Sequence, residues 1–116
     1  MSGLRSHLGG LSAEAAVEAH YAARGARCVQ RRWRGAGGEI DLIFEEPGAV
    51  VFVEVKHARD FATAARRISA AQRSRLFAAA ETYLGRFPEG PLQDCRFDVA
   101  LVDGTGRIEI AENAFS

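Results

Sequence analysis

Three side chains suited to phosphodiester chemistry fall in two neighbouring apolar segments. Asp41 lies within Glu39-Ile40-Asp41-Leu42-Ile43-Phe44, and Glu54 and Lys56 lie within Val51-Phe52-Val53-Glu54-Val55-Lys56. Two facing carboxylates repel each other, and burying them is costly unless a proton or a cation compensates. Mg²⁺ usually takes one or two protein carboxylates and keeps positions for water and a substrate phosphate. Asp41 and Glu54 are therefore candidate ligands for Mg²⁺ or Mn²⁺.

Lys56 is the only lysine among fifteen basic residues, and the others are all arginine. Two residues beyond Glu54 on a strand, it shares the face of that carboxylate. There it can hold or activate an attacking water and stabilise charge on the phosphate. Its amine can also exchange a proton, whereas a guanidinium stays charged. The alternative is a solvated face on which Glu39 and Lys56 form a cross-strand ion pair.

A β-hairpin must position these groups. Both segments alternate apolar and polar residues, and Pro47-Gly48 supplies the turn between them. If Phe44 lies opposite Val51, Asp41 lies opposite Glu54 and Glu39 opposite Lys56, all on one face. The other face then carries Ile40, Leu42, Phe44, Val51, Val53 and Val55.

The remaining segments complete an α/β pattern. Their spacing predicts a helix over 12–24, a strand over 26–34 near an edge, helical structure over 62–87 with some loop before Ile68, a turn over 88–91, and strands over 96–102 and 107–110. Ser12 is the expected N-cap of the first helix, and Gly25 its stop. Residues 35–38 are expected to be a flexible lead-in. The order α-β-β-β-α-β-β predicts a mixed sheet flanked by helices, with the hairpin in a central position.

Composition restricts the class of protein. At 116 residues, with 47% hydrophobic and 26% charged residues, the chain is expected to form a single domain over 1–116. No apolar run approaches the length of a membrane span or a secretory signal, so a cytoplasmic location is expected. Cys28 and Cys95 match no zinc-ligand spacing and are expected to be free thiols packed as small apolar groups.

The hairpin motif also carries a resemblance. Gly38-Glu39-Ile40-Asp41-Leu42-Ile43 followed by Val51-Phe52-Val53-Glu54-Val55-Lys56 resembles the signature of the PD-(D/E)XK nuclease superfamily. More closely, the chain resembles the small bacterial YraN family, from the helix around Glu14 to Asn113-Ala114-Phe115. That family is related in fold to archaeal Holliday-junction resolvases and restriction endonucleases. The resemblance implies a restriction-endonuclease-like fold and metal-dependent cleavage of DNA.

Carried over residue by residue, the resemblance implies metal ligation by Asp41 and Glu54, with Lys56 as the catalytic lysine and Glu14 as a further catalytic acid. A carboxylate in the first turn of a helix is also favoured by the macrodipole alone, which is the alternative for Glu14. Glu39 either contributes to the acidic cluster or orients Lys56 through a salt bridge, and the second role is the expected one. Gln72 departs from the family, whose members usually carry a lysine there, although an amide can still hydrogen-bond a phosphate.

Any nucleic-acid contact must come from a local patch, because the formal net charge is zero. The candidate phosphate-binding residues are Arg31, Arg32 and Arg34 around Trp33, and Arg73 and Arg75 on the long helix. Such arginines also arise from ordinary solubility, and Trp33 is either a base-stacking or a core residue.

The expected function is hydrolysis of DNA phosphodiester bonds, with branched or irregular DNA as the substrate class. A two-fold symmetric DNA junction would be compatible with a homodimer, which is kept as a hypothesis. Two alternatives remain. One is a nucleic-acid-binding module that keeps the fold without cleaving, and the other is an interaction domain whose acidic face contacts an unknown protein partner.

Overall fold

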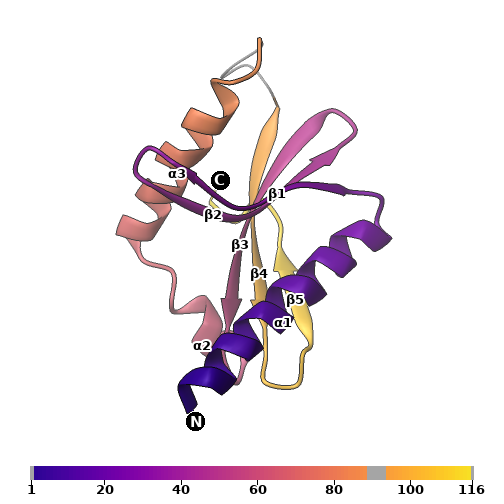
Figure 1. Cartoon of the computed structure of the whole chain (residues 1–116), viewed down its shortest axis with the longest axis vertical. Helices are drawn as coiled ribbons and strands as arrows, with labels where there is room; N and C mark the ends of the chain where they lie inside the picture. Colours follow the sequence, from indigo (N-terminus) through magenta and orange to yellow (C-terminus); the bar gives the residue numbers. More distant parts are fainter. Residues whose placement is uncertain (1, 89–93, 116) are drawn as a thin grey trace.

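The described residues fold into three helices and five strands. The computed structural model describes residues 2–88 and 94–115, with side chains from residue 13 onward. Along the chain lie α1 (Ser2–Ala23), β1 (Arg27–Gly35), β2 (Gly38–Glu46), β3 (Ala49–His57), α2 (Phe61–Ala65), α3 (Ala70–Leu84), β4 (Cys95–Val102) and β5 (Ile108–Ala111) (Figure 1). Every predicted strand is confirmed, with ends that differ by one or two residues.

The strands form one mixed sheet in the order β1-β2-β3-β4-β5. Neighbouring strands are antiparallel except β3 and β4, which are parallel because the segment with α2 and α3 crosses between them. The strand β3 is central, and β1 lies at an edge as predicted. The predicted class, an α/β domain with a mixed sheet flanked by helices, is therefore confirmed and is consistent with a restriction-endonuclease-like fold.

Helices cover both faces of the sheet (Figure 1). On one face, Val17 and Tyr21 of α1 pack in a cluster with Leu42 and Val53. On the other face, Leu76 of α3 belongs to a second cluster, which includes Ile43, Phe52 and Tyr83. Helix α2 covers Val99 and Leu101 of β4 on the same side as α3. Because β3 is buried on both faces, an unbroken run over 50–54 is shielded from solvent.

The hairpin of β2 and β3 has the predicted register, with Phe44 opposite Val51. One apolar position is a correction. Ile40 was expected beside Leu42, but it packs in the cluster of α3 instead. Its partner on β1 is Trp33, which follows Arg32, a residue with a left-handed backbone (φ 49°). We attribute the change of face to this interruption of β1, because a left-handed residue breaks the regular alternation of a strand.

The first helix is longer than predicted. It begins at Ser2, so Ser12 is not its N-cap and Glu14 lies beyond its first turn. No proline interrupts residues 2–11, and a formed helix extends at little cost for each added residue. The helix macrodipole therefore does not explain a carboxylate at position 14, because the effect of the macrodipole fades after the first turn. Gly25, with φ +89°, follows the helix end as predicted.

The predicted long helix is two helices. Asp60 caps α2 by accepting a hydrogen bond from the Thr63 N–H at 2.8 Å. Ser69 caps α3 by accepting from the Gln72 N–H at 3.0 Å, with an extended backbone that ends the preceding turn. Two N-caps start two helices, which is why residues 66–69 form a connection. The turn expected over 88–91 lies largely outside the described residues.

Two smaller expectations also change. Ala36 and Gly37 form a tight turn between β1 and β2, with Gly37 at φ +88°, in place of a flexible lead-in. Cys28 and Cys95 are free thiols; Cys28 is half-buried against the core, whereas Cys95 is exposed and is not packed as an apolar group.

Candidate functional site

Asp41 and Glu54 lie where β2 and β3 stop pairing. The last ladder pair is Leu42 with Val53, and one further step along each strand reaches the two carboxylates. At this point, the Val55 N–H donates to Asp41 Oδ2 at 2.7 Å. A side-chain carboxylate therefore accepts the backbone donor where the ladder has ended.

Glu54 is a buried carboxyl group, with only 7% of its surface exposed. Burial raises its pKa to about 9, helped by a hydrogen bond with Asp41 and by the negative charge of Asp41, while the Lys56 charge acts the other way. Glu54 therefore holds a proton at neutral pH when no cation is bound. A divalent cation would replace that proton and stabilise both carboxylates as anions.

Lys56 belongs to the same row as Glu54. Its Nζ lies 3.9 Å from Glu54 Oε1, and its side chain is only 17% exposed. The expected salt bridge between Lys56 and Glu39 does not occur among the ion pairs of the described residues. Glu39 instead lies 3.3 Å from Arg34 Nε. The reason is that the β2 residues before Leu42 do not pair with β3. They pair with β1 instead, where Glu39 is opposite Arg34.

The acids open into a cavity of about 300 Å³ between the sheet and α3. Glu39, Asp41 and Glu54 line its sheet side, and Gln72, Arg75 and Leu76 of α3 line the other. We call these six residues the acidic pocket. Five of them are residues to which the sequence assigned a role. The tertiary fold therefore brings an amide and a guanidinium, both hydrogen-bond donors, to face two candidate metal ligands.

The donor set of the acidic pocket fits a hard divalent cation with few protein ligands. In the described part of the chain, no group of three or more His, Cys, Asp or Glu side chains is arranged to hold a metal ion. The pair of Asp41 and Glu54 would thus leave most coordination positions to water and substrate. That pattern suits Mg²⁺ or Mn²⁺ better than Zn²⁺, which prefers nitrogen and sulfur ligands.

Glu14 is not among the residues of the acidic pocket. Its carboxylate lies 3.2 Å from Arg32 Nε, in a separate depression on the side of α1. Arg31 lies in the same depression and donates to Glu18 at 2.9 Å through Nε. The implied catalytic group of Glu14 with Asp41 is therefore not supported by this arrangement, because Asp41 faces α3.

The arginines proposed to contact phosphate are dispersed. Arg31, Arg32 and Arg34 are each paired with an acidic side chain of the same chain. Arg75 lines the acidic pocket, while Arg73 lies against the ring of Phe115 in another pocket. Trp33 packs edge-on against Tyr83, with ring centroids 5.3 Å apart, so its indole belongs to the core.

A buried polar network on the α1 side went unpredicted. The Tyr21 hydroxyl donates to Asp98 Oδ2 at 2.6 Å, and Asp98 also accepts from Arg96 Nε at 3.0 Å. Arg96 in turn contacts Glu46 at 3.2 Å. The signal in the sequence was a pair of charges, Arg96 and Asp98, within an otherwise apolar strand. This network joins α1 to the sheet.

The fold defines a class. A mixed sheet with helices on both faces, in the order α-β-β-β-α-β-β, is consistent with a restriction-endonuclease-like α/β domain. The chain belongs to the uncharacterised protein family UPF0102, the YraN family, whose model matches residues 13–102. Separately, no helix within the described residues is long and apolar enough to cross a membrane.

Relatives match nearly the whole chain. A UPF0102 protein of Ruegeria pomeroyi is 58% identical over 113 residues, covering 97% of this chain and 92% of that protein. One from Cereibacter sphaeroides is 51% identical over 116 residues, covering 100% and 99%. One from Roseobacter denitrificans is 49% identical over 115 residues, covering 99% and 89%. The family membership therefore covers the hairpin, the acidic pocket and both flanking helices.

Proposed function

We propose that this protein is a metal-dependent endonuclease that hydrolyses DNA phosphodiester bonds, with branched or irregular DNA as its substrate class. The observation that carries the proposal is the buried carboxyl group of Glu54, beside Asp41 and 3.9 Å from Lys56. Burying an acid pair is destabilising for the fold, so its presence in an accessible cavity favours a functional role.

Asp41 and Glu54 would hold the Mg²⁺ or Mn²⁺ ion. When bound, such an ion supplies Lewis-acid stabilisation of the phosphate oxygens and lowers the pKa of a coordinated water. Lys56 would hold the attacking water by hydrogen bonding and stabilise negative charge on the phosphate. Gln72 and Arg75 would donate to phosphate oxygens from the α3 side.

One observation favours a second candidate, a DNA-binding module that does not cleave. Gln72 stands in the acidic pocket where a lysine is expected from the family resemblance. An amide supplies hydrogen bonds but no charge, so it would stabilise the negatively charged transition state less than a lysine would. The two candidates differ in cleavage and agree in DNA binding.

The test is cleavage of plasmid, linear and four-way-junction DNA in the presence of Mg²⁺ or Mn²⁺. Asp41→Asn keeps the side-chain size and weakens the proposed metal ligation, and Lys56→Met keeps an unbranched side chain and removes the ammonium. Glu109→Gln is the matched control, because Glu109 is an exposed carboxylate on β5, outside the acidic pocket. We expect metal-dependent cleavage by the wild type and the control, and at least about a hundredfold loss in the other two variants.

The alternatives have distinct outcomes. Salt-sensitive DNA binding by the wild type without any cleavage would favour the binding module. If the wild type neither binds DNA nor responds to divalent ions, the acidic face is better explained as a surface for a protein partner. Cleavage that survives in purified Asp41→Asn would exclude this site.

A further inference from the structure

A second pocket lies beside Glu54 and Lys56 on the same face of the sheet. In the parallel pairing of β3 and β4, Glu54 is opposite Val99 and Lys56 is opposite Leu101. Paired residues of neighbouring strands point to the same face. Val99 and Leu101 both line the second pocket. One strand spacing therefore separates the floor of this pocket from the proposed catalytic groups.

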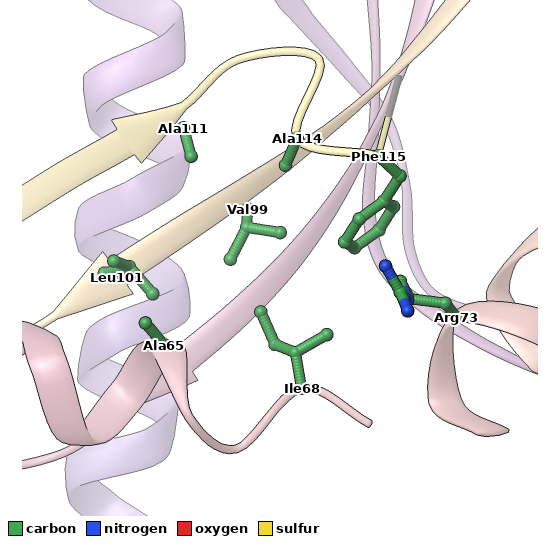
Figure 2. Close-up of a pocket in the computed structure, with 8 residues that line it drawn as sticks. All are labelled: Ala65, Ile68, Arg73, Val99, Leu101, Ala111, Ala114 and Phe115. Atoms are coloured by element: carbon green, nitrogen blue, oxygen red, sulfur yellow. The ribbon is translucent and has the colours of Figure 1, made fainter. Parts of the chain in front are cut away.

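Seven of the eight described residues that line the second pocket have apolar side chains, and the pocket has a volume of about 310 Å³. Figure 2 shows Val99 and Leu101 of β4 on one side, Ala65 and Ile68 on another, and the ring of Phe115 beside Arg73. This volume lies at the lower end of the range for small-molecule pockets, which suits a group the size of a nucleobase. We call this site the apolar pocket.

Among the described residues that line the apolar pocket, Arg73 alone carries a charge. Its guanidinium carbon lies 5.8 Å from the centroid of the Phe115 ring. Within residues 13–88 and 94–115, Arg73 forms no ion pair, whereas Arg31 and Arg34 each have a carboxylate partner. An unpaired guanidinium beside an apolar pocket favours a ligand that combines an apolar ring with an anionic group.

The first turn of α3 lies between the two pockets. Gln72 lines the acidic pocket and its neighbour Arg73 lines the apolar pocket. Because Gln72 and Arg73 are consecutive residues and Glu54 pairs with Val99, a nucleic-acid strand with one phosphate at Asp41 and Glu54 would pass this turn with its adjoining nucleotide. The adjoining base would then lie over the apolar pocket.

We propose that the apolar pocket receives an unpaired, unstacked nucleobase from the nucleotide next to the scissile phosphate. Phe115 would stack on the base, and Arg73 would pair with the phosphate of that nucleotide. A base held in a duplex could not enter without first unpairing, so entry would select DNA with an unpaired nucleotide. The inference rests on the proposed function, since the scissile phosphate defines which nucleotide is adjoining.

The test is DNA binding in EDTA, where no cleavage occurs. Fluorescence anisotropy compares a duplex with one unpaired thymidine, the same duplex with an abasic unpaired site, and a fully paired duplex. We expect the wild type to prefer the unpaired base over the abasic site by about tenfold. Ala65→Phe, which fills the pocket, and Phe115→Ala should abolish this preference without changing affinity for paired DNA.

Two control variants separate the pocket from general effects. Ala62→Phe places the same ring on the exposed surface of α2, outside the pocket lining, and should keep the preference. Arg73→Ala should weaken binding to the unpaired-base and abasic duplexes equally, because its partner is a phosphate. If Phe115→Ala does not fold, Ala65→Phe still decides the matter.

The outcomes distinguish the two proposals. Equal affinity for the unpaired base and the abasic site would overturn this inference, as would a preference that survives Ala65→Phe or an absence of DNA binding. If the affinities are equal, or if the preference survives Ala65→Phe, metal-dependent cleavage of the same duplexes that requires Asp41 would still support the proposed function. A base preference without cleavage would support the pocket and overturn the nuclease proposal.

Discussion

Gly38 lies directly against the backbone of Arg75. A Cβ atom at Gly38 would be 2.8 Å from the Arg75 carbonyl oxygen and 3.1 Å from the Arg75 Cβ. The first distance is shorter than real Cβ contacts allow, and its partner is helix backbone, which cannot move alone. The absence of a side chain at the start of β2 therefore lets α3 approach the acidic pocket closely enough for Gln72 and Arg75 to line it.

Gly38→Ala should displace α3 from β2. We expect a loss of about 1–3 kcal/mol in the free energy of unfolding, the range for overpacking in a well-packed region. Urea denaturation measures this loss. The control is Gly104→Ala, because the nearest atom to a Cβ there is Arg59 Cα at an ordinary contact distance of 3.5 Å. Equal stability of the two variants would contradict the close approach.

Glu54→Gln should change how stability depends on pH. The pKa of Glu54 is raised from an ordinary value of 4.5 to about 9, so the folded state binds the proton more tightly than the unfolded state. The wild type is therefore destabilised as pH rises between these values, while a neutral glutamine is not. In EDTA, the stability advantage of Glu54→Gln should grow with pH, reaching on the order of 1–3 kcal/mol near about pH 8.

Thermal or urea unfolding across this pH range measures the effect, with Glu109→Gln as the exposed control. Adding Mn²⁺ should stabilise the wild type but not Glu54→Gln, since only the wild type can exchange the proton for the ion. If the stability difference between the wild type and Glu54→Gln does not change with pH, burial does not raise the pKa of Glu54.

Arg75 and Arg31 should differ in their contribution to DNA binding. Arg75 lines the acidic pocket and has no ion pair within the described residues, whereas Arg31 is held by Glu18. We expect Arg75→Ala to weaken DNA binding severalfold. The slope of log affinity against log salt concentration should fall by about one, because about one fewer ion is released on binding. Arg31→Ala should leave affinity within about twofold, as for a side chain without a phosphate contact. Fluorescence anisotropy at several salt concentrations tests both, and equal losses would contradict the assignment.

Tyr21→Phe should destabilise the fold through one hydrogen bond. The Tyr21 hydroxyl donates to the buried Asp98 at 2.6 Å, and its ring stacks on Phe44 with centroids 4.4 Å apart. Phenylalanine keeps the stack and removes the donor, so about 1–3 kcal/mol of unfolding free energy should be lost. The Tyr83 hydroxyl forms no hydrogen bond within the described residues, so Tyr83→Phe should leave the free energy of unfolding nearly unchanged. Denaturant midpoints provide the comparison.

Local patterning was sufficient for the strands and for the hairpin register. The alternation of β2 and β3 repeats every two residues, so a shift by one would have moved Phe44 and Val51 to the wrong face. The same alternation predicted that Glu54 and Lys56 lie on one face of β3. The break between α2 and α3 was also present locally, in the capping residues Asp60 and Ser69, but helical spacing on both sides concealed it.

The sequence by itself identified the candidate metal ligands, because residue type and strand period are local properties. Only the tertiary structure decided their surroundings: that Glu39 pairs with Arg34, that Glu14 lies on the α1 side, and that Arg73 and Arg75 belong to different pockets. These relationships depend on where β2 leaves β3 and how closely α3 packs, and both follow from contacts between segments far apart in the chain. No period or spacing within one segment encodes such contacts.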